Sequence, residues 1–229
     1  MNWEQEKERL SVKYKPGTWR YYVHLWARVI KSWYHKSPAF SVRIEGARNY
    51  VPYIPPGCKI QIFGQDNTVK IDPSVTTFMG LIRMGDPDIP VRGCTVKVGS
   101  RSSCGGANIM LYEDNSAVYV GDECMLSFGI EIWASDSHSI IDSKNKQLVN
   151  WGKEIVIGNH VWIGMRSILL KNSYIADDCM VGAGSVVAGK FKEPHCILAG
   201  NPARVVKKGF SWDSLRPIQY REKVSIQTR

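Results

Sequence analysis

Aliphatic residues recur at every sixth position through the second half of the chain. The members of this series are Ile157, Ile163, Leu169, Ile175, Val181 and Val187, and the same frame occurs earlier at Val120, Leu126 and Ile132. A small residue follows most of them, and another residue, mostly small, stands four positions after each. A six-residue period fits neither an α-helix nor the simple alternation of a strand. It predicts a parallel β-helix, in which three short strands and their turns close one coil.

The rest of the chain extends this architecture at both ends. Residues 51–119 contain strand-like runs such as CKIQIF, CTVKV and NIMLY between turn residues, which indicates further coils interrupted by loops. Closer to the N-terminus, apolar residues at three- and four-residue steps predict an amphipathic helix: Trp19, Tyr22, Val23, Trp26, Ile30 and Trp33. We therefore expect an N-terminal helical segment over 1–50, an all-β parallel β-helix domain over 51–206 and a basic C-terminal tail over 207–229.

The six-residue period fails over a loop at residues 133–154. Solenoid proteins carry their chemistry on loops rather than on their regular faces, so this interruption is the strongest candidate for a functional site. It contains His138, and Asp136 stands two residues before it. A carboxylate can fix the tautomer of an imidazole ring and raise its basicity, so the pair predicts a general base. An ordinary surface histidine is the alternative.

The net charge of +9 is concentrated at the two ends of the chain. Residues 1–36 carry eight Lys/Arg and three Glu, residues 204–229 carry seven Lys/Arg and two acids, and the segment between them carries fifteen basic and sixteen acidic residues. A nucleic-acid-binding body is normally basic throughout, so the near-neutral body argues against a nucleic-acid partner. We expect no membrane-spanning segment and no secretion signal, and the six cysteines, which lack metal-ligand spacing, are expected to be reduced thiols.

Several motifs resemble those of the hexapeptide-repeat acyltransferases. These are His138 in its loop, NHVWIG at 159–164, VGAGSVV at 181–187 and ILAGNPARVVKK at 197–208. The pattern is most similar to the maltose/galactoside-type and bacterial polysaccharide O-acetyltransferases, with good agreement over 120–208 and none over 1–50 or 209–229. The resemblance implies a left-handed coil, acetyl-CoA as co-substrate, no metal, and a homotrimer whose active sites lie between neighbouring subunits.

The resemblance also assigns roles to individual residues. His138 matches the family's general base, which takes the proton of the acceptor hydroxyl as that oxygen attacks the thioester. Trp162 matches an indole beside the thioester and the acceptor, although a structural aromatic residue at a corner of the coil is the alternative. Asn108 lies near the family's oxyanion-stabilising amide, and the backbone N–H groups of Gly105 and Gly106 are alternative donors.

For acetyl-CoA, the resemblance points to small residues at one edge of the coil and to a basic cluster. The positions that match the pantetheine arm are Gly164, Met165, Ala183, Gly184 and Ser185. Arg204, Lys207 and Lys208 match the residues that meet the CoA phosphates, and Lys190 is a further candidate. The chain departs from related enzymes at Ala188-Gly189-Lys190, where they often have Thr-Lys. The residues at the nucleotide end of the pocket therefore differ from the family pattern.

The resemblance therefore implies an acetyl-CoA-dependent O-acetyltransferase acting on a sugar or a polysaccharide such as a capsule, an O-antigen or an exopolysaccharide. The alternatives are an N-acetyltransferase of an amino-sugar and a non-catalytic β-helix that binds a partner. A γ-type carbonic anhydrase needs three metal-binding histidines, and no third histidine is suitably spaced from His138 and His160. We expect a cytoplasmic location, with the N-terminal helix docked either on a sister subunit or on the inner membrane.

Overall fold

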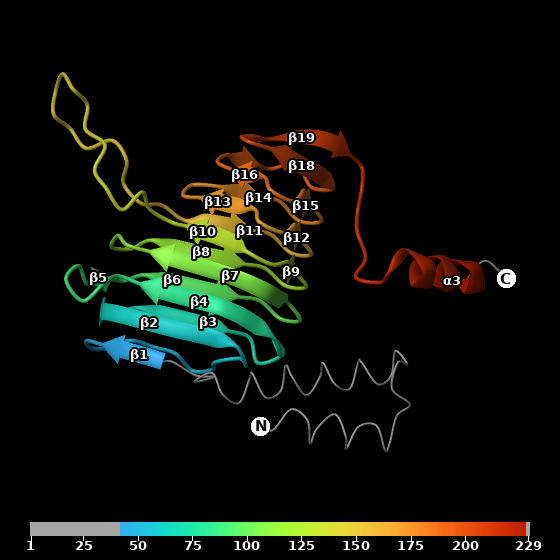
Figure 1. The fold of residues 1–229 in the computed structure, drawn as a ribbon, viewed down its shortest axis with the longest axis horizontal. Helices are drawn as coiled ribbons and strands as arrows, with labels where there is room; N and C mark the ends of the chain where they lie inside the picture. Colours follow the sequence, from blue (N-terminus) through green and yellow to red (C-terminus); the bar gives the residue numbers. More distant parts are fainter. Residues whose placement is uncertain (1–41, 228–229) are drawn as a thin grey trace, which may run out of the picture. The chain divides into compact units, whose positions relative to one another are not determined.

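The computed structural model describes residues 42–227, which form a coil of short strands followed by one helix (Figure 1). The strands are β1 (Val42–Glu45), β2 (Cys58–Gln65), β3 (Thr68–Ile71), β4 (Phe78–Met84), β5 (Val91–Arg92), β6 (Thr95–Val98), β7 (Ser103–Leu111), β8 (Ala117–Val120), β9 (Met125–Leu126), β10 (Ile130–Trp133), β11 (Ile155–Ile157), β12 (Trp162–Ile163), β13 (Ile168–Leu170), β14 (Tyr174–Ile175), β15 (Met180–Val181), β16 (Val186–Val187), β17 (Lys190–Phe191), β18 (Cys196–Gly200) and β19 (Ala203–Lys208). The helix α3 is Pro217–Gln227. The amphipathic helix expected in the N-terminal segment lies outside the described residues.

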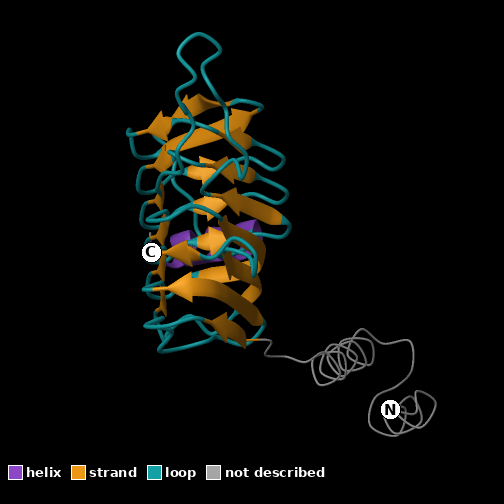
Figure 2. Cartoon of the chain, turned by 90° about the vertical axis from the view of Figure 1, so that its left-hand side faces the viewer, coloured by secondary structure: helices purple, strands orange, loops and turns teal. Residues whose placement is uncertain are grey.

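The strands stack into three faces, which confirms the predicted parallel β-helix (Figure 2). Face A consists of β9, β12, β15 and β18, face B of β10, β13 and β16, and face C of β3, β6, β8, β11, β14 and β17. Each strand pairs in parallel with the strand one coil away, as in Ile163 opposite both Leu126 and Val181. The longer strand β7 bends from face A to face B, because it pairs with β9 through Cys104 and with β10 through Ile109.

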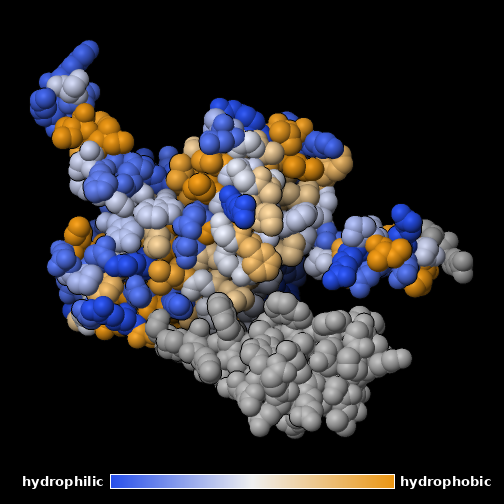
Figure 3. All heavy atoms as spheres, in the orientation of Figure 1, coloured by the Kyte–Doolittle hydropathy of each residue, from blue (hydrophilic) through white to orange (hydrophobic). Residues whose placement is uncertain are grey.

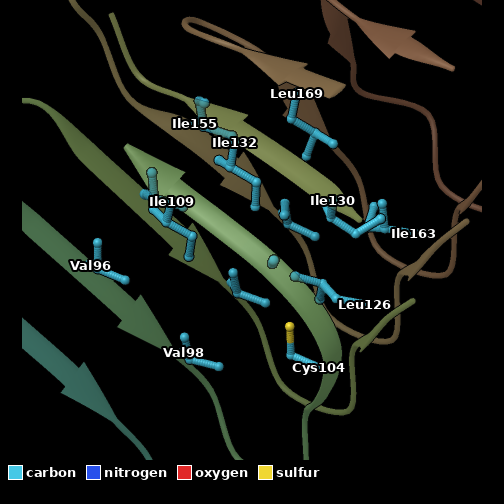
Figure 4. Close-up of a cluster of buried hydrophobic side chains, with 14 of the residues drawn as sticks. Val96, Val98, Cys104, Ile109, Leu126, Ile130, Ile132, Ile155, Ile163 and Leu169 are labelled. Carbon is cyan, nitrogen blue, oxygen red and sulfur yellow. The ribbon is translucent and has the colours of Figure 1, made fainter. Parts of the chain in front are cut away.

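The aliphatic series forms the core of the coil. Every member of the six-residue series is at most 4% exposed: Val120, Leu126, Ile132, Ile157, Ile163, Leu169, Ile175, Val181 and Val187. Figure 4 shows Leu126, Ile132, Ile163 and Leu169 among the buried side chains inside the coil. The earlier coils contribute residues such as Ile82 and Ile109, both fully buried. The prediction that 51–119 contains further coils is therefore confirmed, and the period of six arises because one aliphatic side chain per face points inward.

The small residues of the repeat have two separate structural roles. Glycines that follow the aliphatic residue stand where one coil meets the next: a Cβ on Gly158 would lie 2.3 Å from Asp177 Oδ1. The residue four positions after the aliphatic closes the corner when it is serine, because its hydroxyl donates to the carbonyl three residues before it. The Oγ–O distances are 2.8 Å for Ser167, 2.6 Å for Ser173 and 2.7 Å for Ser185.

Two boundaries of the coil differ from those expected from the sequence. The sheet already begins at β1, whose Ile44 pairs with Ile62, so the coil starts at Val42 rather than at residue 51. At the other end, β19 continues to Lys208 as an antiparallel partner of β18. The segment beyond it, expected as a basic tail, contains the helix α3. Among all the described residues, 42–227, no helix is long and apolar enough to cross a membrane.

Candidate active site

One long excursion, residues 134–154, leaves the coil between β10 on face B and β11 on face C, and we call it the arm (Figure 1). Its only strand-like contact is an antiparallel bridge between Ile141 and Leu148. The arm carries an apolar patch below a polar tip (Figure 3), made of side chains that are 55–66% exposed: Ile140, Ile141, Val149 and Trp151. His138 is exposed near the base of the arm, as the break in the repeat predicts for a functional histidine.

Asp136 does not hydrogen-bond the His138 ring within the described part of the chain. Its Oδ2 instead accepts hydrogen bonds from Lys171 Nζ at 2.5 Å and from Asn150 Nδ2 at 2.8 Å. The hydrogen bond from Lys171 is the largest cause that holds the pKa of Asp136 below its usual value. The expectation that Asp136 orients the imidazole by a direct hydrogen bond is therefore wrong for this geometry, because the ammonium group of Lys171, in the next coil, binds the Asp136 carboxylate instead.

Trp162 projects outward from face A and is 39% exposed. The indole of Trp212, in the segment between β19 and α3, lies 6.1 Å from it, centroid to centroid. Trp212 also stacks on His160 at 4.5 Å and 8°, and its Nε1 donates to the His160 carbonyl at 2.7 Å. Asp178 Oδ1 lies 2.8 Å from His160 Nδ1, so a cluster of aromatic and hydrogen-bonding contacts fixes this segment beside Trp162.

Trp162 and His138 lie on different sides of one chain. Trp162 belongs to face A, whereas the arm that carries His138 leaves at the corner between faces B and C, which is the corner opposite face A (Figure 1). Trp162 and the base of the arm therefore lie on opposite sides of the three-sided coil.

Asn108 lies on the outer side of face B and already has a partner. Its Nδ2 donates to Glu131 Oε1 at 2.7 Å, and the other oxygen of Glu131 accepts from Trp133 Nε1 at 3.1 Å. Within a single chain, Asn108 on face B and Trp162 on face A lie on different faces of the coil. Its role as an oxyanion donor stays a prediction, as does the alternative role of Gly105 and Gly106 at the bend of β7.

The residues expected to line the pantetheine arm gather at the corner between faces A and B, but their exposure differs. Met165, Ala183 and Gly184 are exposed, and a Cβ on Gly184 would meet nothing within 4 Å. Gly164 is buried against the next coil, with its N–H bonded to the Val181 carbonyl. The Ser185 side chain is buried and closes a corner, so only its backbone can contribute to an external pocket.

Some of the basic residues expected to bind the CoA phosphates already have other partners. Lys208 Nζ lies 2.6 Å from Glu193 Oε2, and Lys207 Nζ lies 5.5 Å from the centroid of the Phe210 ring. Arg204 is exposed on β19, with its guanidinium donating to the Ala203 carbonyl, and Lys190 is exposed on β17. Lys208 is therefore the member of this cluster that would have to leave a carboxylate to bind a phosphate, whereas no carboxylate pairs with Arg204, Lys190 or Lys207 within the described residues.

The six cysteines are buried and form no disulfide within the described residues, and their reduced state stays a prediction. Burial raises the pKa of Cys58 and of Cys104 to about 12, and that of Cys124 to about 11, so these thiols are poor nucleophiles near neutral pH. Within residues 42–227, no group of three or more His, Cys, Asp or Glu side chains is arranged to hold a metal ion.

The sequence interpretation missed Lys171, Asn150 and Trp212. Lys171 reaches the arm only because β13 stacks on β10, a pairing that the break in the repeat hides. Asn150 has no periodic signal, although it is only 9% exposed inside an otherwise exposed arm. Trp212 lies beyond the last repeat, where nothing in the sequence indicates which coil it contacts.

The fold and the site together define a class of protein: a parallel β-helix of six-residue repeats with one long arm that carries a histidine. The sequence profile described as "Bacterial transferase hexapeptide (six repeats)" matches residues 154–189. A polysialic acid O-acetyltransferase of Neisseria meningitidis is 34% identical over 179 residues, which is 76% of this chain and 80% of that protein. That of Escherichia coli O1:K1 is 30% identical over 124 residues, 54% of this chain but only 40% of its own length.

A solved structure agrees with these relatives. The polySia-specific acetyltransferase NeuO superposes with a TM-score of 0.60 at 25% identity, covering 84% of this chain and 98% of that one. The chain belongs to the hexapeptide-repeat acyltransferase family, among its sugar and polysaccharide O-acetyltransferases. Its predicted family and enzyme class are thereby confirmed.

Proposed function

We propose that this protein transfers an acetyl group from acetyl-CoA to a hydroxyl of a bacterial polysaccharide, of the capsule, O-antigen or exopolysaccharide type, with His138 as the general base. The observation that carries the proposal is the 34% identity over 76% of the chain to an O-acetyltransferase whose named acceptor is polysialic acid. The position of His138 agrees with the proposal, because its exposed ring stands on the one arm that interrupts the coil.

The proposed step is a direct transfer. The acceptor oxygen attacks the thioester carbonyl while an imidazole nitrogen of His138 takes the hydroxyl proton, so that a C–O bond forms. The C–S bond then breaks, and the departing CoA sulfur recovers the proton from the imidazolium. Histidine suits this role because its ordinary pKa lies closest to neutral pH, which allows one side chain to accept the proton and return it.

We infer that the working unit is a homotrimer of left-handed coils. A single chain separates His138 from Trp162, so the arm of one subunit would reach the face A edge of its neighbour. The apolar patch on the arm supports this assembly, because its isoleucines, Val149 and Trp151 are more than half exposed in the single chain. Each site would then join one subunit's base to another subunit's indole.

We propose that acetyl-CoA lies along the corner between faces A and B. The exposed backbone at Ala183 and Gly184 leaves open space for the pantetheine arm, and Met165 offers it an apolar contact. Arg204 is the candidate for the phosphates, because a guanidinium can make paired hydrogen bonds with phosphate oxygens. Use of acetyl-CoA also supports a cytoplasmic location, because that co-substrate is made there. Contact of the N-terminal segment with the inner membrane or a sister subunit stays a prediction.

The test follows CoA release with a thiol reagent, using acetyl-CoA and three acceptors: polysialic acid, a neutral galactoside and an amino-sugar. We expect transfer to at least one saccharide, and a loss of about 10²- to 10⁴-fold in His138→Ala. His195→Ala is the matched control, because His195 is also exposed but lies at the corner before β18. Unchanged turnover in His138→Ala would contradict the base assignment.

The bond formed in the product separates the alternatives. Mild alkali cleaves an O-acetyl ester, whereas an N-acetyl amide survives it. An alkali-stable product formed only on the amino-sugar would therefore contradict O-acetylation and identify the enzyme as an N-acetyltransferase. Binding of a saccharide without any CoA release would favour a non-catalytic binding protein.

A further inference from the structure

The register of the coil places a lysine at the base of the arm. Strands β10 and β13 pair with Trp133 opposite Leu170, so the residues that follow these two positions lie one above the other. The lower chain then leaves as the arm, while the upper chain continues its coil through Lys171. The Lys171 side chain, 19% exposed, places Nζ 2.5 Å from Asp136 Oδ2 and 2.5 Å from the Asn150 carbonyl oxygen.

Asn150 joins the two limbs of the arm. Its Nδ2 donates to Asp136 Oδ2 and to the His138 carbonyl oxygen, both at 2.8 Å, and its Oδ1 accepts from the Ile140 N–H at 2.8 Å. The residue is only 9% exposed, so these hydrogen bonds are shielded from competing water. Lys171, Asp136 and Asn150 thus form one connected group, which we call the Lys171 clamp.

The clamp holds the backbone on both sides of His138. The preceding residue, Ser137, has a φ of 61°, in the left-handed region that a serine adopts only at a cost in free energy. Hydrogen bonds to Asp136 before it and to His138 after it hold this turn in place. The conformation of Ser137 in turn determines the direction in which the His138 side chain leaves the arm.

We propose that Lys171 and Asn150 are positioning residues, which fix the backbone at His138 so that its imidazole meets the acceptor hydroxyl in a reactive geometry. This inference rests on the proposed function. Asp136 belongs to the same device: it orients the base through the arm's backbone rather than through the ring. The charge of Lys171 is required because it anchors the Asp136 carboxylate to the rigid coil, whereas the rest of the arm extends away from it.

Lys171→Met tests the charge, and Lys144→Met is its matched control, because Lys144 is an exposed lysine near the tip of the same arm. In Lys171→Met, we expect kcat to fall about tenfold to a hundredfold with little change in KM for acetyl-CoA, because misplacement of the base affects the chemical step. Lys171→Arg, which can also donate to Asp136, is expected to recover most of the loss. Lys144→Met should match the wild type.

Hydrogen exchange gives a readout that does not depend on activity. The Ile140 amide is bonded to Asn150, so its exchange should accelerate about tenfold or more in Lys171→Met, while the amides of β12 and β15 stay protected. Unchanged exchange in the arm would overturn the clamp, and faster exchange with unchanged kcat would overturn its role in positioning. Absence of acetyl transfer in the wild type would instead refute the proposed function, and the exchange result would still decide whether the clamp exists.

Discussion

Gly164→Ala tests how the coils are spaced beside Trp162. A Cβ at this position would lie 2.5 Å from the Val181 carbonyl oxygen and 2.7 Å from the Ala183 nitrogen, both of which are backbone atoms of the next coil. Ordinary non-bonded contact needs about 3.5 Å, so the two coils would have to separate locally by roughly 1 Å. The hydrogen bond from Gly164 N–H to the Val181 carbonyl, 2.8 Å long, would be lost or stretched.

The expected destabilisation follows from these two effects. Overpacking of a well-packed interior costs about 2 kcal/mol, and a lost backbone hydrogen bond adds about 1 kcal/mol, giving about 3 kcal/mol in total. For a chain of this size, 1 kcal/mol lowers the melting temperature by about 3 °C, so Gly164→Ala should melt about 9 °C below the wild type. Urea unfolding at one fixed protein concentration is the second measurement.

Gly184→Ala is the control for backbone strain without a clash. Gly184 has a φ of 71°, and a Cβ there would have no heavy atom within 4 Å. An alanine in the left-handed region costs about 1 kcal/mol, which predicts a fall of about 3 °C. A Gly184→Ala variant as unstable as Gly164→Ala, or an unchanged Gly164→Ala, would refute the account of glycine as the spacer between coils.

Three further predictions concern individual groups. Ser135 Oγ is buried without a hydrogen-bond partner in residues 42–227, so Ser135→Ala should leave the melting temperature unchanged or raise it by a few degrees; a loss of stability would reveal a missing partner. The six buried thiols should react with a disulfide reagent only after denaturation, so a fast native thiol would contradict their burial. Because Lys171 lowers the folded-state pKa of Asp136, its ionic contribution is present above the unfolded value of about 3.9 and lost as the pH falls through the lower folded value. The melting difference between the wild type and Asp136→Asn should therefore shrink as the pH is lowered below the unfolded value, and a constant difference would contradict the ion pair.

The sequence predicts those parts of the fold that repeat. Ile163 and Leu169 reveal the core because every coil places an aliphatic residue at the same inward position, and the same regularity makes the arm visible as an interruption. The strand β1 escapes this reasoning because its residues are exposed throughout, so Val42–Glu45 carries no alternation of buried and exposed positions. A periodic pattern of apolar residues reflects periodic burial of side chains. An exposed edge strand has few buried side chains and therefore no such pattern.

The sequence predicts which residues belong to the candidate site but not which contacts they make. His138 follows from its place in the arm, yet the partner of Asp136 is Lys171, 35 positions later, brought there by the stacking of β13 on β10. A charge two residues from a histidine is the natural partner to choose when only neighbours in sequence are visible. Trp212 shows the same limit, because its contact with His160 depends on the path of the chain after the last strand.

Complementation between two inactive variants tests the central claim that the base and the indole of one active site come from different chains. His138→Ala and Trp162→Ala would be co-expressed in equal amounts and assayed for CoA release with acetyl-CoA and an acceptor that the wild type uses. Each variant alone is expected to be nearly inactive. In randomly mixed trimers, about a quarter of the sites combine an intact arm with an intact indole, so the mixture should recover about a quarter of wild-type activity. Activity no higher than that of the separate variants would contradict a site shared between subunits.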